Sequence, residues 1–136
     1  MVRSVLGVVL GVVVWMVGFW ILATLLAQLW PDYAVHGRRW MRAGEFTFTP
    51  LMALCNLVIW VLAETGAGWV AGRIARRREA VWVLAGLVGI YLAVLHLVLY
   101  WSRFPWWYNL GVVVPAVPAV LSGARLANSL RSTSLN

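Results

Sequence analysis

Charge is scarce in this sequence of 136 residues. Only 11% of the residues are charged, four are acidic, and lysine is absent, so all 11 basic residues are arginines. Soluble domains average about 25% charged and 45–50% apolar residues, whereas 63% of this chain is apolar. A chain this short has too little interior to bury so much apolar surface in water. Despite a net charge of +7, the composition excludes a soluble domain, a disordered tail and a nucleic-acid-binding domain, and it predicts an integral membrane protein.

Cysteine and the familiar catalytic motifs are also lacking. The single cysteine, Cys55, excludes an internal disulfide, a CxxC redox pair and a thiolate metal cluster. The sequence contains no P-loop, GxSxG or HExxH motif, and its few acidic residues are scattered. We therefore predict no catalytic, cofactor or metal site, and we expect that the protein is not an enzyme.

Long apolar runs, in contrast, are abundant. A helix needs about 20 mostly apolar residues to cross a bilayer, and four runs of this kind are separated by polar segments. The first run is too long for the apolar part of a typical signal peptide, so we expect it to be retained. The sequence predicts an all-α membrane protein with a single domain over residues 1–136, a four-helix bundle with antiparallel neighbours. The expected helices are 4–29, 50–72, 80–101 and 108–127, with an outer loop at 30–49 and a polar tail at 128–136.

The arginines predict how these helices are oriented. Cytoplasmic loops of membrane proteins are enriched in Arg and Lys. If the N-terminus is cytoplasmic, seven arginines lie inside and four lie outside, which predicts that both termini are cytoplasmic. The inner set is Arg3, Arg73, Arg76, Arg77, Arg78, Arg125 and Arg131, and the outer set is Arg38, Arg39, Arg42 and Arg103.

Three segments carry a resemblance to a known group of proteins. They are Gly68–Ala75, the Pro105-Trp106-Trp107 turn and Pro118–Ala127. They resemble a group of small four-helix bacterial membrane proteins of uncharacterised function, in which the first helix also ends near an aromatic–proline pair. The outer loop of this sequence is more basic and less rich in proline than in that group. The resemblance implies four helices in a bacterial inner membrane and implies no activity.

Glu64 is the most informative polar residue in the predicted spans. A carboxylate at that depth costs about 2.5–3.5 kcal/mol, so Glu64 is expected to face a partner, to face water or to be protonated. Helical spacing places it on one stripe with Asn56, Trp60, Gly68 and Gly72. The GxxxG pair on this stripe lets another backbone come close, which predicts that Glu64 points into a contact between helices.

Arg125 is the expected partner of Glu64. Counted from the outer ends of two helices that run in the same direction, the two side chains have similar depths, and Ser122 is placed to add a hydrogen bond. Such a pair would lower the insertion cost of each charge and would hold the second and fourth helices together. Proton-coupled transport through Glu64 and its pairing with another chain are the alternatives.

The two histidines differ in their surroundings. His96, near the outer end of the third helix, is predicted to be a hydrogen-bonded residue in a helix interface, because no second ligand shares its depth with metal-ligand spacing. His36 belongs to the outer loop, whose charged residues predict a solvated surface facing the lipid. Those charged residues are Asp32, Arg38, Arg39 and Glu45.

Small residues line each of the predicted helices. Stripes of glycine and alanine allow helices to pack closely in a membrane. In the fourth helix, Pro115 and Pro118 predict a kink. The glycines expected to pack against other helices are Gly7, Gly11, Gly18, Gly68, Gly72, Gly86 and Gly89.

Two functional hypotheses follow from these features. The first is a non-enzymatic membrane protein that packs against itself or against an unidentified membrane partner, since small-residue stripes are plentiful and pore-lining polarity is scarce. The alternative is a small transporter or channel that works as an oligomer and uses Glu64. In both hypotheses the surroundings are the lipid bilayer, with no nucleic acid and no cofactor.

Overall fold

The computed structural model describes residues 1–75 and 77–133, with side chains as far as Leu130. Within this part of the chain the structure is all-helical, with five α-helices and no strand. Predictions for Arg76, for the side chain of Arg131 and for residues 134–136 fall outside the described residues. The elements are α1 (Val2–Leu29), α2 (Pro31–Ala43), α3 (Pro50–Ala75), α4 (Arg78–Ala93), a π-helical segment (Val94–Leu99) and α5 (Trp106–Thr133).

Four of these helices are long and apolar enough to cross a membrane, as predicted. They are α1, α3, α4 continued by the π-helical segment, and α5. The predicted end of the fourth helix at residue 127 is wrong, because α5 continues into the polar tail as far as Thr133. Its last turns contain good helix formers such as Ala127 and Leu130 and no glycine or proline that would stop the helix.

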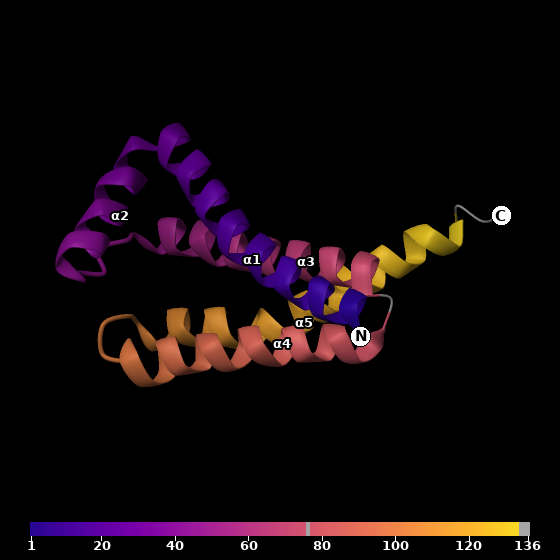
Figure 1. Cartoon of the computed structure of the whole chain (residues 1–136). Helices are drawn as coiled ribbons and strands as arrows, with labels where there is room; N and C mark the ends of the chain where they lie inside the picture. The colour runs from indigo at the N-terminus through magenta and orange to yellow at the C-terminus, as the bar shows by residue number, and fades with distance from the viewer. Residues whose placement is uncertain (76, 134–136) are drawn as a thin grey trace.

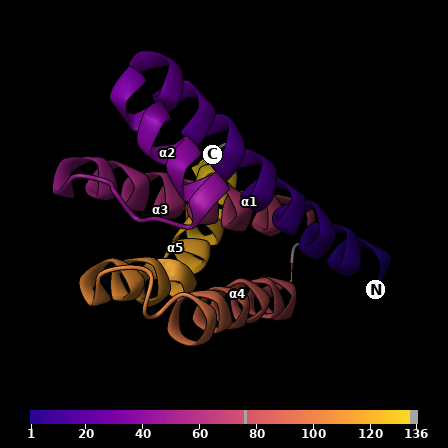
Figure 2. The ribbon, with the colours of Figure 1, turned by 90° about the vertical axis from the view of Figure 1, so that its left-hand side faces the viewer.

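The prediction of an outer loop at 30–49 is also wrong, because most of it forms α2. Pro31 occupies the first turn, where its missing N–H costs nothing, and Asp32 adds a favourable negative charge there. Gly44 ends the helix with φ 67°, a left-handed conformation that suits glycine. Figure 1 shows α1 diverging from α3 towards its C-terminal end and α2 returning across that space, and Figure 2 shows the same arrangement from the side.

The centre of the molecule is α3, which makes its most extensive contacts with α5 and α1. A Cβ atom added at Gly68 would collide with the backbone of Val120, and one added at Gly72 would lie 3.0 Å from the Cα of Ala124. The glycines thus let the α3 and α5 backbones come close. The contacts of α3 with α4, the next helix in the chain, are less extensive, which differs from the expected packing of consecutive helices.

Two helices depart from regular α geometry. The end of the third span is π-helical over Val94–Leu99, and the N–H of Tyr100 bonds the carbonyl of Leu95 at 2.8 Å. Such π-helical turns often occur at functional sites. In α5, which changes direction part-way along its length in Figures 1 and 2, Pro115 and Pro118 lie within the helix.

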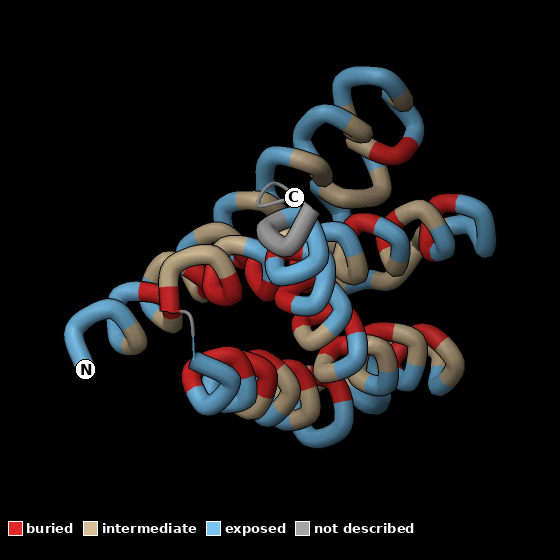
Figure 3. Tube along the Cα trace, turned by 90° about the vertical axis from the view of Figure 1, so that its right-hand side faces the viewer, coloured by how far each residue is buried: buried red, intermediate tan, exposed pale blue. Residues whose placement is uncertain are grey.

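Burial follows the contacts between helices. Buried residues face one another between the helices, and exposed residues cover the outside (Figure 3). The outside is largely apolar, as the half-exposed Val9, Trp20 and Leu62 illustrate. Only 17% of the most apolar window of α1 is buried. An outer surface of this kind suits hydrocarbon and not water.

Candidate functional site

A cavity of about 370 Å³ lies beneath α2. This volume falls in the range of small-molecule binding sites, about 300–1,000 Å³. Residues from α1, α2, α3, the π-helical segment and α5 line the cavity, so it depends on α2 crossing between α1 and α3 (Figure 1). Its main aromatic and polar lining residues are Phe19, Trp20, Tyr33, Arg38, Trp40, Phe48, Asn56, Trp60, His96, Tyr100, Phe104 and Tyr108.

Asn56 is the centre of a polar network in the cavity wall. Its Nδ2 donates to the Tyr33 hydroxyl at 2.5 Å, and its Oδ1 accepts from the Tyr108 hydroxyl at 2.6 Å. The network joins α2, α3 and α5 at one point, and all three side chains are buried. Burial raises the pKa of Tyr33, against a smaller lowering by its hydrogen bond with Asn56.

His96 is held by a second buried polar residue, Asn109, which the sequence-based predictions did not include. Its Nδ1 lies 3.0 Å from Oδ1 of Asn109, while Nδ2 of Asn109 donates to the carbonyls of Trp101 and Phe104 at 3.4 and 3.3 Å. These carbonyls fix the amide orientation, so the histidine must donate from Nδ1. In the neutral ring Nε2 is then a hydrogen-bond acceptor. His96 is therefore a hydrogen-bonded interface residue.

The cavity combines aromatic walls with a few polar atoms. Phe19 stacks on Trp60 with ring centroids 4.0 Å apart, and Trp40 lies 4.4 Å from Phe104. Tyr33 accepts its bond from Asn56, which leaves its own O–H proton as a donor. With the acceptor on His96, the site can bind an apolar body that ends in a hydroxyl or carbonyl group.

The expected pair of Glu64 and Arg125 does not form. Glu64 is fully buried, and neither of its carboxylate oxygens has a hydrogen-bond partner in the described structure. Arg125 is exposed, and its neighbour Ala124 meets Gly72. Arg125 is therefore level with Arg73, about nine residues or roughly 13 Å along α3 from Glu64.

The register between α3 and α5 keeps Arg125 away from Glu64. The α5 helix begins at Trp106, earlier than the predicted start, and α3 and α5 pack in a register that places Val120 beside Gly68. The predicted depths of Glu64 and Arg125 were counted from the predicted helix ends and therefore did not include this register. Ser122, expected to support the pair, is exposed.

The predicted packing glycines lie in different surroundings. A Cβ at Gly7 would lie 2.8 Å from the Cβ of Ala75, and one at Gly11 would lie 2.5 Å from Leu84. At Gly89 the nearest atom, on Val117, would be 2.9 Å away. The predictions for Gly18 and Gly86 are wrong, because a Cβ added at either position would meet no atom within 4 Å. These two glycines face open space. A stripe of small residues in a sequence does not show whether a neighbouring helix packs against it.

The surface of α2 matches part of its expected character. Its charged residues are exposed, as expected for a solvated face, and they are Asp32, Arg38, Arg39 and Arg42. His36 is half-buried, and its Nδ1 lies 2.7 Å from the Thr47 hydroxyl. His36 therefore ties α2 to the segment that leads into α3.

Three residues of the site were missed at the level of sequence: Tyr33, Tyr108 and Asn109. Asn109 carried a usable signal, because an amide within an apolar helix needs hydrogen-bond partners. The tyrosines carried none, since tyrosine at the end of a span is common at the membrane surface.

No cluster of three or more His, Cys, Asp or Glu side chains suited to a metal ion occurs within the described residues.

In comparisons with known proteins, no family model, curated sequence or solved structure matched this chain. The resemblance to small bacterial membrane proteins therefore stays an expectation.

Proposed function

We propose that this chain is a non-enzymatic multi-pass membrane protein that binds a small amphiphile in the cavity beneath α2. The supporting observation is an aromatic-lined cavity whose wall contains the Tyr33–Asn56–Tyr108 network and His96. The two hydrogen bonds of Asn56 form without a ligand and position Tyr33 and Tyr108, so the cavity is preformed, and preformed sites avoid the cost of ordering on binding.

The proposed setting is a bacterial inner membrane with both termini in the cytoplasm. The four long apolar helices and their apolar outer surfaces support a membrane location. The excess of arginines at the end that contains Arg3 and Arg77 supports the orientation. The N-terminus and the end of α5 lie at this same end of the molecule (Figure 1). The cavity then lies near the outer surface, with α2 over it.

The cavity chemistry limits the ligand. The walls suit a ring system or a short hydrocarbon chain, and the donor on Tyr33 and the acceptor on His96 suit a hydroxyl or carbonyl end. Arg38 is exposed and lines the cavity, so it can contact a polar group near the entrance. These features favour a neutral or weakly acidic amphiphile that partitions from the bilayer.

A second candidate function rests on Glu64. A carboxyl group with no exposed surface and no hydrogen-bond partner is costly, and such groups in spans often belong to proton or substrate pathways. Glu64 lines neither the cavity beneath α2 nor the basic cavity between α4 and α5. Its position therefore supports an oligomeric transporter less directly than the cavity supports ligand binding.

Purification with analysis of the bound molecules tests the proposal. We expect the wild-type protein in mild detergent to retain an amphiphile that solvent extraction releases and mass spectrometry identifies. Ala23→Trp should reduce its amount several-fold, because Ala23 lines the cavity. Gly18→Trp is the matched control on the same helix, because Gly18 does not line the cavity and a Cβ added there meets no atom within 4 Å. Equal retention by both variants, or none by the wild type, would contradict the proposal.

A further inference from the structure

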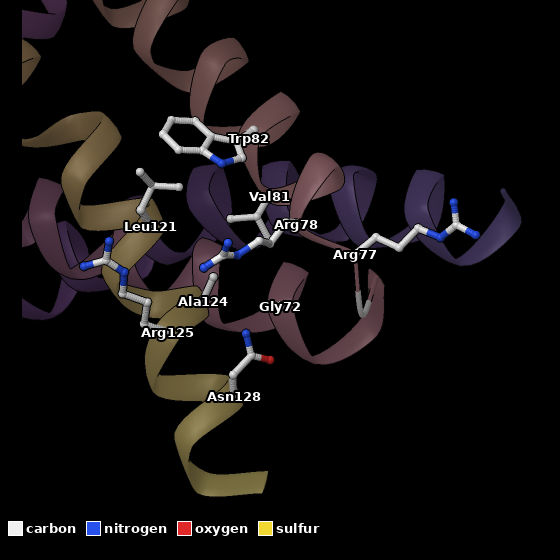
Figure 4. A pocket seen from close by; sticks show the side chains of 9 residues that line it. All are labelled: Gly72, Arg77, Arg78, Val81, Trp82, Leu121, Ala124, Arg125 and Asn128. Atoms are coloured by element: carbon white, nitrogen blue, oxygen red, sulfur yellow. The ribbon is translucent and has the colours of Figure 1, made fainter. Parts of the chain in front are cut away.

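A second cavity lies at the opposite end of the molecule from α2, between the start of α4 and the last turns of α5. Its volume is about 260 Å³, and Figure 4 shows the residues that line it. The lining residues are Gly72, Arg77, Arg78, Val81, Trp82, Leu121, Ala124, Arg125 and Asn128. It is separate from the cavity beneath α2, with which it shares no lining residue.

The charge of this cavity is of one sign. In Figure 4 the Arg78 side chain reaches from α4 towards α5, the Arg125 side chain runs along α5, and Arg77 points away; Arg78, Arg125 and Asn128 all line the cavity. No acidic residue lines the cavity. Glu79, the acidic residue next to Arg78 in the chain, is exposed and outside the lining. Two guanidinium groups that line one cavity repel each other, and a bound anion would be attracted by both.

The neighbouring surface is apolar. Val81 and Leu121 line the cavity beside the arginines, and Trp82, also in the lining, is 58% exposed. A tryptophan beside arginines at the end of a span is typical of the level of lipid headgroups. The surface thus changes from cationic to apolar over the length of one side chain.

We propose that this cavity binds the phosphate group of an anionic phospholipid, with Arg78 and Arg125 as its ligands. Arg binds phosphate through paired N–H donors, and basic pockets between transmembrane helices suit anionic headgroups. The amide of Asn128 donates a further hydrogen bond, and the acyl chain lies along Trp82 and Leu121. The proposal requires only the four spans and does not depend on a ligand beneath α2.

Native mass spectrometry in a zwitterionic detergent tests this site with phosphatidylglycerol as the probe and phosphatidylcholine as the neutral comparison. We expect the wild type to prefer phosphatidylglycerol, and the double variant R78Q/R125Q to bind it roughly tenfold more weakly. R78K/R125K should lie between them, because lysine keeps the charge without the paired donors. Circular dichroism of each variant establishes that it is folded.

Arg3→Gln is the matched control, because Arg3 is exposed at the same end of the molecule and does not line the cavity. It should leave phosphatidylglycerol binding unchanged, and a loss equal to that of R78Q/R125Q would show only a general attraction between charges and would overturn the proposal. Equal binding by the wild type and R78Q/R125Q would overturn the proposal. If millimolar inorganic phosphate displaced the lipid, or if glycerol phosphate bound as tightly as phosphatidylglycerol, the ligand would be a free phosphate compound and not a phospholipid, which would overturn the proposal.

Discussion

The two halves of the contact between α3 and α5 are stabilised in different ways. In the half nearer to α2, which we call the outer half by its place in the fold alone, Asn56 joins Tyr108 and Tyr33 through hydrogen bonds. In the inner half Gly68 and Gly72 bring backbones together, and the close contacts are with Val120 and Ala124. Glu64 lies between these halves with neither kind of support, since it is fully buried and its oxygens accept no hydrogen bond from the described residues.

This comparison shows how one short interface can serve as both anchor and binding site. Close backbone contact leaves no space, so the inner half fixes the helices rigidly. The outer half relies on directional hydrogen bonds between large side chains, which leave the cavity beneath α2 open while giving Nδ2 and Oδ1 of Asn56 one hydrogen bond each. We therefore expect stability to depend mainly on the inner half and ligand binding on the outer half.

The largest effect is expected for Gly68→Ala. The added Cβ would collide with the backbone of Val120, which cannot move aside as a flexible side chain can. We expect a loss of about 3 kcal/mol in the free energy of unfolding, measured by titrating SDS into mixed micelles and following circular dichroism. Gly86→Ala is the control, because its Cβ meets open space. Similar losses for both would show that the inner half is not held by close backbone contact.

The next effect is expected for Asn56→Leu. This change leaves the Tyr108 and Tyr33 hydroxyls without their partner in a buried position. We expect a loss of about 2 kcal/mol, accompanied by faster proteolysis within α2, because Tyr33 ties that helix to α3. Leu54→Asn, at an exposed position of the same helix, provides an amide outside the network. If α2 keeps its protease resistance in Asn56→Leu, the network does not hold it.

A smaller effect of opposite sign is expected for Glu64→Met. The substitution removes a buried polar group without partners and keeps a similar volume, so we expect a gain of about 1 kcal/mol in the free energy of unfolding. In a double-mutant cycle, Glu64→Met and Arg125→Gln should show a coupling below about 0.5 kcal/mol. A coupling above that value would restore the ion pair that the sequence suggested.

The smallest effect concerns the dependence of stability on pH. Because burial raises the pKa of Tyr33, its folded form holds the phenol proton more tightly than the unfolded form. The resulting stability is complete below the ordinary tyrosine pKa of about 10 and is lost as pH rises above it. Tyr33→Phe should therefore show a shallower loss of stability between about pH 9 and 11. Identical slopes for both proteins would mean that Tyr33 does not ionise with unfolding.

Much of the architecture could be predicted because it depends on local patterns. The four spans follow from apolar length, and the stripe that contains Asn56, Gly68 and Gly72 follows from the period of the helix. The α2 helix was also within reach of the sequence. Pro31 and Gly44 mark its two ends, but the segment was predicted to be a loop because it lies between two apolar runs.

The candidate site could not be predicted to the same extent, because it depends on the register between helices. Asn56 contacts Tyr108 only because α3 and α5 pack in a particular register, and no local sequence pattern predicts that register. The same limitation produced the wrong partner for Glu64. Asn109 shows the complementary case, since the sequence could have indicated its need for partners but not their identity, which is His96 and two backbone carbonyls.

Photolabelling in membranes tests the central claim, that the cavity beneath α2 binds an amphiphile, most directly. The probe is a long-chain alcohol with a photoreactive group, and mass spectrometry locates the labelled residues. The account predicts that labels concentrate on cavity residues such as Trp40 and Tyr100 and that excess unlabelled alcohol removes them. Labels spread evenly over lipid-facing residues such as Ile90 and Val98, with no effect of competitor, would contradict it.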